Sequence, residues 1–433
     1  MILAIFVLVT LLLVFGMPVA FALGLAGVVG ILATAGPDAA FGFLQSTPYR
    51  SAASFNLSVI PMFLLMGELA ASSGMTRDIF NAISRWVGHL PGGLAITTVI
   101  ASAFIAAISG SSTASSGMLA KVAVDEMERF GYARKMALGV VTVSGTLAIM
   151  IPPSIALVLY GILSQTSIGA LLVAGIIPGI MTAVLLCIAT AAWAIHSPHL
   201  APRTPAATWT ERFSSLRGVW PLMVLVVLVL GSIYSGAATP TEAASIGAVG
   251  TFLITLWYFR GVSRPALTRA LIRTAHSTTM IFLIILGATL FGYFMTISQT
   301  TQGLVSGVAG LHVPPAAIIG ILVLMYLILG FFMEQIAILT LTVPIVVPVV
   351  MALGFNPIWF GVIQTMTAEI GLAHPPLGLN IYVVASAAET TPEEVISGIW
   401  WPLAALLLSL LLLLLLPQLS LFLPEHMMHV RSG

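Results

Sequence analysis

The segment SGTLAIMIPPS, residues 144–154, places two consecutive prolines inside an apolar run, and TAEIGLAHPP, residues 367–376, repeats that arrangement. Proline has no backbone N–H and its ring displaces the carbonyl group four residues earlier, so each pair predicts a broken helix with free carbonyl groups. In lipid, such breaks are tolerated only where protein buries them or where they line a cavity. The composition of the chain decides whether the surroundings are lipid.

The 433-residue chain is 59% hydrophobic, and its 15 Lys and Arg and 14 Asp and Glu amount to only 7% of all residues. An ordinary soluble domain carries about a quarter charged residues, so lipid is the solvent for most of this chain. Long continuous apolar runs favour membrane-spanning helices over the alternating strands of a membrane β-barrel. The net charge of +1 offers no basic surface to nucleic acid. Residues 1–15 lack the basic start of an export signal, so we expect them to form the first helix.

The two proline pairs belong to an internal duplication. An offset of 223 residues takes Pro152 to Pro375 (375 − 152 = 223) and Gly24 to Gly247 (247 − 24 = 223). Internal repeats of this kind are typical of secondary transporters. We predict a first repeat over residues 1–200, a cytoplasmic connector over 201–217 and a second repeat over 218–425.

Each repeat is predicted to contain five full spans and one re-entrant helical hairpin, a helix pair that enters and leaves the membrane on one side. The hairpins are expected at 93–124 and 314–352, and the proline-broken spans at 137–160 and 358–385. Five is an odd number of crossings, so the second repeat is inverted relative to the first. This arrangement puts every Lys and Arg except Arg50 and Arg431 on one side, which the positive-inside rule identifies as cytoplasmic.

The tip of the first hairpin, SGSSTASSG at residues 109–117, consists of small and mostly hydroxyl-bearing residues. Hydroxyl and carbonyl oxygens are hard ligands suited to Na⁺, and the N-terminus of the outgoing helix offers N–H groups to an anion. The alternative is a patch of small residues that packs helices together. The length of the run favours the functional interpretation.

The second hairpin tip, GFFMEQIA at residues 330–337, carries Glu334, and another acid, Glu369, precedes the second proline pair. Acids at membrane depth are functional by default. The alternative for Glu334 is a structural hydrogen bond to a helix break. We expect Glu68 and Glu242 to be structural anchors, and the alternative is a role in ion coupling. No Arg lies inside the predicted spans, so an anion bound there would have to be held by hydroxyl groups and helix N-termini.

Motifs of enzymes are absent from the sequence. The eight histidines form no zinc-binding spacing, and neither GxxxxGK[ST] nor GxSxG occurs. His374 stands alone and is expected to be hydrogen-bonded rather than a metal ligand. We therefore expect a transporter and not an enzyme.

Together these motifs resemble one transporter family, the large membrane (permease) subunits of the TRAP (tripartite ATP-independent periplasmic) transporters. The segments that carry the resemblance are PMFLLMGELAASSGM (61–75), GSSTAS (110–115), IPPS (151–154), MEQIAILTLTVPIVVPV (333–349) and HPPLGLN (374–380). The resemblance implies an all-α polytopic membrane protein of an elevator-type ion-transporter superfamily, in which a mobile domain carries both hairpins. It also implies Na⁺-coupled uptake of an organic anion, such as a C4-dicarboxylate or sialic acid.

The same resemblance implies partners. A periplasmic substrate-binding protein would deliver the anion, and a small four-helix membrane subunit would join this chain in the bilayer of a bacterial or archaeal inner membrane. The two repeats account for the whole length, so we expect an unfused large subunit that is inactive alone. A stand-alone ion-coupled carboxylate transporter of the same superfamily is the nearest alternative. A membrane-embedded enzyme or channel is the distant one, because the sequence shows neither a catalytic constellation nor a polar-lined pore.

Roles for individual residues are implied as well, with two or more Na⁺ ions as the coupling ions. One Na⁺ is expected at the first tip and first break, near Gly110, Ser111, Ser112, Ser115, Ser144, Gly145 and Thr146. A second is expected near Met333, Glu334, Ala337, Thr367, Glu369 and Gly371. Substrate is expected between the tips, next to Ser112, Thr113, Ser115, Pro152, Pro153, Pro375, Pro376 and Asn380.

Overall fold

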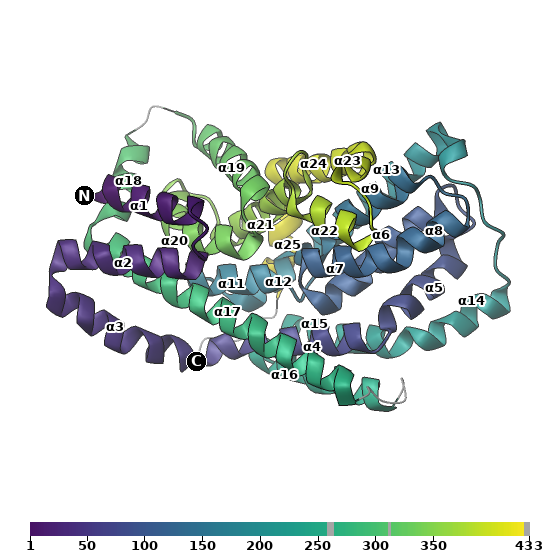
Figure 1. Cartoon of the computed structure of the whole chain (residues 1–433), viewed down its shortest axis with the longest axis horizontal. Helices are drawn as coiled ribbons and strands as arrows, with labels where there is room; N and C mark the ends of the chain where they lie inside the picture. The colour runs from purple at the N-terminus through teal and green to yellow at the C-terminus, as the bar shows by residue number, and fades with distance from the viewer. Residues whose placement is uncertain (258–263, 311–312, 428–433) are drawn as a thin grey trace.

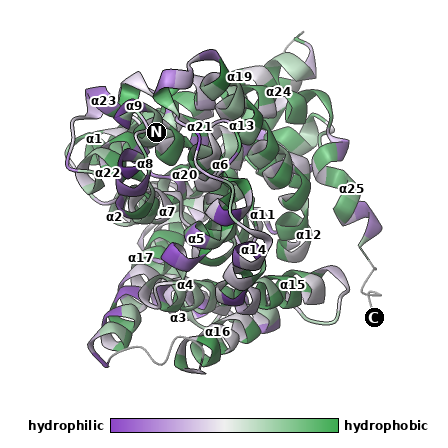
Figure 2. Ribbon diagram, turned by 90° about the vertical axis from the view of Figure 1, so that its right-hand side faces the viewer, coloured by the Kyte–Doolittle hydropathy of each residue, from purple (hydrophilic) through white to green (hydrophobic). Residues whose placement is uncertain are grey.

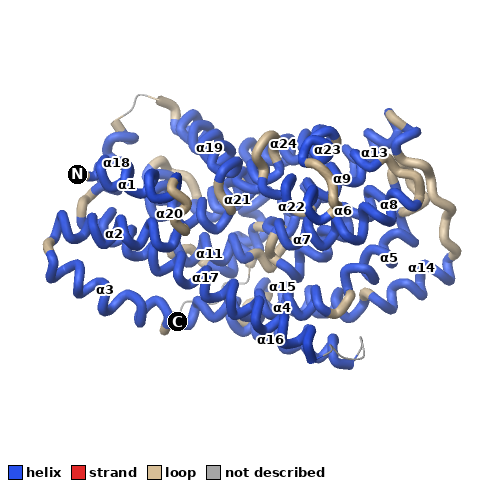
Figure 3. Tube along the Cα trace, in the orientation of Figure 1, coloured by secondary structure: helices blue, strands red, loops and turns tan. Residues whose placement is uncertain are grey.

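A computed structural model describes residues 1–257, 264–310 and 313–427, and within these ranges all regular secondary structure is helical (Figure 3). The prediction of an all-α membrane protein is confirmed. Figure 2 shows that hydrophobic residues dominate most of these helices, as expected for segments that face lipid or each other. Two residues used in the topology prediction, Arg260 and Arg431, lie outside the described residues.

Thirteen helices form the first half of the chain. They are α1 (Ile2–Val14), α2 (Val19–Ala35), α3 (Pro37–Ala52), α4 (Val59–Ser72), α5 (Met75–Val87), α6 (Gly93–Ser109), α7 (Ser112–Leu119), α8 (Asp125–Arg129), α9 (Arg134–Ser144), α10 (Leu147–Met150), α11 (Ile155–Ser164), α12 (Ile168–Ala174) and α13 (Ile176–His196). A π-helical turn, Ala120–Val124, joins α7 to α8, so the charged segment that follows the first tip is helical as far as Arg129.

The remaining helices follow a connector that itself contains α14 (Trp209–Ser215). They are α15 (Trp220–Tyr234), α16 (Pro240–Trp257), α17 (Arg264–Ile297), α18 (Thr300–Ala309), α19 (Pro315–Phe332), α20 (Gln335–Ala352), α21 (Pro357–Ala373), α22 (Leu379–Ala387), α23 (Pro392–Ser397), α24 (Trp400–Leu415) and α25 (Gln418–His426). The predicted spans at 314–331 and 335–352 thus match α19 and α20 almost residue for residue.

By length and composition, five helices of the described residues could each cross a membrane, or up to eight if each sharply bent pair is one span. One bent pair is Arg134–Met150 with Ile155–Ser164, which turns by 42° at the first proline pair. The apolar helices α1, α2 and α6 are shorter, at 10–17 residues. Glycine and proline inside the apolar runs divide them into shorter helices than a hydropathy pattern predicts.

The longest helix, α17, extends over 34 residues from Arg264 to Ile297 and packs against α2 and α4 (Figure 1). We expected this span to begin at residue 277. Instead Arg269 and Arg273 belong to the same continuous apolar helix. Both arginines are exposed and lie N-terminal to residue 277, so the helix continues beyond the predicted apolar span into a polar segment that carries basic residues.

Glycines set the close contacts between the long helices. A Cβ added at Gly27 of α2 would lie 2.6 Å from the backbone carbon of Leu290 in α17, and one at Gly287 would lie 2.2 Å from the Ala20 carbonyl oxygen. Gly247 of α16 faces α4, where an added Cβ would lie 2.7 Å from the Met66 sulfur. Small residues let helix backbones approach closely in membranes, where lipid removes the hydrophobic driving force. These two pairings, α2 with α17 and α16 with α4, are equivalent under the 223-residue offset.

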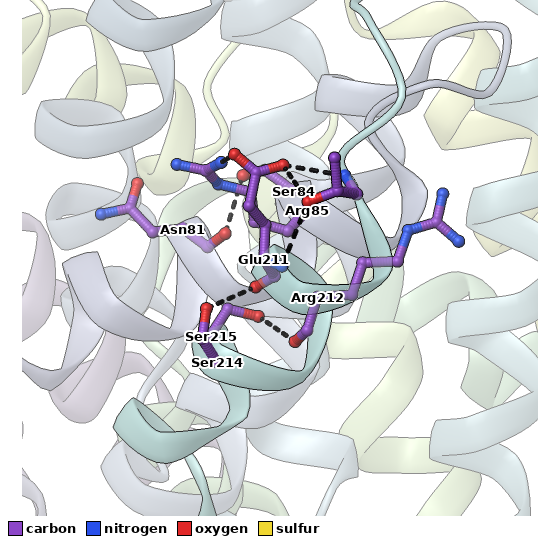
Figure 4. Close-up of polar contacts among 8 residues, drawn as sticks. Asn81, Ser84, Arg85, Glu211, Arg212, Ser214 and Ser215 are labelled. Carbon is purple, nitrogen blue, oxygen red and sulfur yellow. Dashed lines mark hydrogen bonds and ion pairs between the residues drawn. The ribbon is translucent and has the colours of Figure 1, made fainter.

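The connector is fastened to the first half by polar contacts. Arg85 Nη1 of α5 lies 3.1 Å from Glu211 Oε1 of α14 (Figure 4). The indole N–H of Trp86 donates to the Arg212 carbonyl oxygen at 3.2 Å, and its ring meets Phe213 edge to face. Thr208 caps α14 together with Glu211. The segment 201–217 therefore includes an ordered helix that packs against α5.

The glycine contacts predict a position-specific effect on stability. Gly27→Ala forces α2 away from α17, and overpacking of this kind costs about 1–3 kcal/mol, so we expect a lower thermal unfolding temperature in a detergent-solubilised sample. Gly24→Ala is the matched control on the same helix, because its Cβ would meet Gly287 at an ordinary 3.6 Å. Equal unfolding temperatures for the two variants would contradict the close α2–α17 contact.

Candidate ion and substrate site

The first hairpin tip is a sharp reversal between α6 and α7. Gly110 ends α6 with φ +59°, a left-handed conformation that favours glycine. Ser111 then caps α7, where its hydroxyl oxygen faces the Ala114 N–H. The reversal points the N-terminus of α7, and therefore the positive end of its dipole, into the protein.

The first helix break lies directly against this tip. A Cβ added at Gly145 would lie 1.7 Å from Ser116 Oγ and 3.2 Å from the Ser112 carbonyl oxygen, so only glycine allows α7 to come so close. The Ser102 hydroxyl donates to the Ser144 carbonyl oxygen at 2.6 Å, and Thr146 Oγ1 donates to the Val143 carbonyl oxygen. The structure thus brings Ser112, Ser144, Gly145 and Thr146 into one buried layer.

The proline pair of the first half also contacts the tip. Pro152 and Pro153 are buried in the break between α10 and α11. A Cβ on Gly110 would lie 3.0 Å from the Pro153 carbonyl oxygen. Ser115 is buried as well, and its hydroxyl is engaged by Ser109 at 2.6 Å. The first break therefore packs directly against the first tip.

The second tip has the same order of parts. α19 ends at Phe332, Met333 and Glu334 are extended, and α20 begins at Gln335. The Glu334 carboxylate lies beside the backbone N–H groups of Ile336 and Ala337 at the start of α20. A negative side chain at a helix N-terminus is stabilised by the helix dipole. Under the 223-residue offset Glu334 occupies the position of Ser111, which caps α7.

The second break is held by a glycine contact between α19 and α21. A Cβ on Gly371 would lie 2.7 Å from Gly330 Cα, and one on Gly330 would lie 2.6 Å from the Ala368 carbonyl oxygen. Thr367 Oγ1 donates to the Ile363 carbonyl oxygen and therefore offers an acceptor lone pair only. The close approach places the end of α21 next to the second tip.

Glu369 projects from α21 into the interior between the tips. Its side chain is 1% exposed, and within the described part of the chain neither carboxylate oxygen has a hydrogen-bond partner. The polar groups that act on it are the Ser112 hydroxyl of the first tip and the Glu334 carboxylate of the second. A buried carboxylate is costly without a partner, so this group requires a proton or a cation.

A cavity of about 170 Å³ separates the two tips. The first tip contributes Gly110, Ser111, Ser112 and Thr113, and the second contributes Glu334, Gln335 and Ile336. The walls are apolar and include Ile149, Ile155 and Leu372 beside the two breaks. Segments more than 200 residues apart in the sequence thus enclose one small space with hydroxyl groups and a carboxylate at its edge.

Several other buried polar atoms near the tips and breaks lack a hydrogen-bond partner within the described residues. They are Ser116 Oγ, Ser144 Oγ and the side-chain amides of Gln335 and Asn380. Buried polar groups are normally paired, so unpaired oxygens of this kind fit an oxygen-liganded cation. The sequence-based prediction missed Ser116 and Gln335, although Ser116 lies in the quoted tip and Gln335 follows Glu334.

Some predicted site residues lie elsewhere. Pro376 is exposed and Pro375 half-buried, and neither lines the cavity between the tips. Met333 and Ala337 face a second, mostly apolar cavity of about 1120 Å³ formed with α1, α2 and α17, and Glu334 lines both cavities. Among the described residues no three His, Cys, Asp or Glu side chains cluster to hold a metal ion.

Comparison with known proteins identifies the family of the chain. Residues 6–419 match the family model described as the DctM component of the tripartite ATP-independent periplasmic transporter. The chain belongs to the TRAP transporter large permease family. It is therefore a multi-pass membrane protein, and the resemblance drawn from its motifs is confirmed.

Individual relatives agree with this assignment. The C4-dicarboxylate TRAP transporter large permease protein DctM of Pseudomonas aeruginosa is 35% identical over 403 residues, which cover 93% of each chain. The sialic acid TRAP transporter large permease protein SiaM of Vibrio cholerae is 32% identical over 95% of each chain. Both relatives are transporter permeases rather than enzymes.

A solved structure shares the fold of this TRAP permease. MtrF of Neisseria gonorrhoeae, from a class described as antimetabolite efflux pumps, superposes with a TM-score of 0.64 over 94% of both chains at 13% identity. At such low identity the likeness shows the fold alone. The helical architecture is thus one of membrane transport proteins.

The contact between the first tip and the first break predicts a strict size limit. Gly145→Ala would drive a methyl group into Ser116, and we expect a lower unfolding temperature and impaired transport, with an overpacking cost of about 1–3 kcal/mol. Gly117→Ala on the same tip is the control, because its Cβ would meet Val383 at 3.4 Å. Combining Gly145→Ala with Ser116→Gly should restore stability. A double variant no more stable than Gly145→Ala would refute the contact.

Proposed function

We propose that this chain is the permease of a Na⁺-coupled uptake system for an organic anion such as a C4-dicarboxylate or sialic acid. It works in a bacterial or archaeal inner membrane with a small four-helix membrane subunit and a periplasmic substrate-binding protein. The observation that carries the proposal is the buried acid Glu369, which lies near both the Ser112 hydroxyl and the half-buried Glu334, and Glu334 in turn lines the cavity between the two hairpin tips.

The acids support coupling to a cation. Two carboxylates that act on each other inside a membrane repel, and their charge is stabilised only when a cation joins them. The Ser112 hydroxyl lies next to Glu369. Near the first tip and break, the hydroxyl oxygens of Ser116 and Ser144 also lack a hydrogen-bond partner within the described residues. Oxygen atoms of carboxylates, hydroxyls and helix-break carbonyls are the ligands that Na⁺ takes in transporters with broken helices.

The helix ends support binding of an anion. α7 and α20 both begin at the cavity between the tips, so the positive ends of their helix dipoles favour a carboxylate there. In our proposal Na⁺ neutralises the acids first, and the substrate carboxylate then meets two positive helix ends instead of two negative side chains. Binding of the anion thereby becomes dependent on Na⁺.

Transport itself is proposed to follow an elevator mechanism. The tips and breaks pack together as one unit, whereas α2 packs on α17 through Gly27 and Gly287, and α16 packs on α4 through Gly247 and Met66. The loaded unit slides past the other helices and carries ion and anion across. The membrane potential contributes about 2.3 kcal/mol per net charge per 100 mV.

Reconstitution tests the proposed function. Proteoliposomes with this chain, the small subunit and the binding protein should take up a radiolabelled anion only when an inward Na⁺ gradient is present. Uptake driven equally by a proton gradient in the absence of Na⁺, or uptake by this chain without its partners, would contradict the proposal.

The role of Glu369 predicts a change in Na⁺ dependence. Glu369→Gln removes the charge but keeps the shape, so we expect the Na⁺ concentration for half-maximal uptake to rise at least about tenfold, equivalent to about 1.4 kcal/mol. Glu393→Gln removes an exposed charge on α23 and should leave that concentration unchanged. An unaltered Na⁺ dependence in Glu369→Gln would exclude Glu369 as an ion ligand.

A further inference from the structure

A further cavity, of about 890 Å³ and lined by polar residues, lies on the side of the first tip opposite the cavity between the tips. α4 and α17 form one wall, and α7 and α22 form the other. Three basic residues line it, Lys121, Arg269 and Arg273, together with the acids Glu68 and Glu389. The sequence analysis had indicated an anchor for Glu68 and no Arg inside a span.

The charges in this cavity are only partly neutralised. Glu68 Oε2 lies 3.8 Å from Arg273 Nη1, and the two side chains are 29% and 68% exposed, which makes this a weak ion pair. Within residues 1–257, 264–310 and 313–427 no ion pair involves Lys121 or Arg269, and Arg269 Nε donates only to the Pro265 carbonyl oxygen of its own helix. Two cationic groups therefore remain available for an anion.

The basic cavity adjoins the cavity between the tips. Thr113 lines both spaces, so the two cavities are direct neighbours on either side of this residue. The three basic residues belong to the side that the charge distribution identifies as cytoplasmic. Three basic and two acidic residues leave the cavity with an excess of one positive charge (3 − 2 = 1), and an excess of positive charge raises the local concentration of anions.

We propose that the cavity lined by Lys121, Arg269 and Arg273 is an exit site that binds the carboxylate of the transported anion on its way from the tips to the cytoplasm. This inference rests on the proposed function and adds a second substrate site to it. Arg269 and Lys121 attract the carboxylate, and Glu68 competes with it for Arg273. The competition keeps binding weak, so the substrate is passed on rather than retained.

The test uses a cysteine placed in the cavity. Ser386 is exposed and lines the space, and Cys187 is the only native cysteine, so Ser386→Cys in a Cys187→Ala background provides one reactive site. Its reaction rates with a negatively charged sulfonate thiol reagent and a positively charged ammonium reagent are compared. We expect the ratio of the sulfonate rate to the ammonium rate to fall at least about fivefold when Arg269→Gln or Lys121→Gln is added. A fivefold change in rate corresponds to about 1 kcal/mol.

The matched control is Arg264→Gln. Arg264 is exposed on the same helix and does not line the cavity, so this variant removes the same charge from α17 and should leave the ratio unchanged. An equal fall in Arg264→Gln, or no fall in either cavity variant, would overturn the proposal. This readout requires no transport, so it is independent of whether Na⁺-coupled uptake is found.

Ligand protection identifies the anion. Millimolar succinate or sialic acid should slow the sulfonate reaction at Ser386→Cys several-fold, and Arg269→Gln should abolish this protection. Lipid phosphate is the other source of a negative group, so the protein is also compared in nanodiscs with and without phosphatidylglycerol. Protection by phosphatidylglycerol and by neither carboxylate would assign the cavity to lipid headgroups and overturn the exit site.

Discussion

Backbone groups freed at a helix break must find partners within the protein, because lipid offers none. This constraint explains how the interior is built. At each break a glycine allows two chain segments to pack in close contact. Gly145 packs against Ser116 in the first half, and Gly371 packs against Gly330 in the second. The breaks can exist because the tips cover them, and the tips are held in place because the breaks support them. The site between them follows from this mutual dependence.

The chain has few charged residues, and those near the first tip belong to two different cavities. Glu334 lies at the second tip and Glu369 on α21 near Ser112, and among the described residues no basic side chain lines the cavity between the tips. The basic residues Arg269 and Arg273 belong to α17 and line a different cavity, which lies on the opposite side of the first tip. A cation is favoured at the first place and an anion at the second. A substrate that moves with a cation and is released as an anion would use both.

Hydropathy and proline spacing predicted the helical fold and the positions of both tips with considerable accuracy. α19 and α20 begin and end within a residue or two of the predicted arms, since the polar pair Glu334 and Gln335 interrupts a long apolar run. α3 and α18 were not predicted, because their mixed composition matches neither a span nor a linker. The start of α17 was placed 13 residues too late (277 − 264 = 13), because hydropathy detects apolar composition and not helix continuity.

The sequence by itself determined the membrane environment, the helical class, the family and the residue types at the two tips. Each of these depends on composition or local order, such as 7% charged residues or two prolines in succession. Only the tertiary structure decided which of the candidate residues meet. It brought Ser112, Glu334 and Glu369 together, left Pro375 and Pro376 outside the cavity, and added Ser116, Gln335 and the basic residues of α17. The physical reason is that contacts between segments more than 200 residues apart depend on how helices pack through their glycines, which no local pattern records.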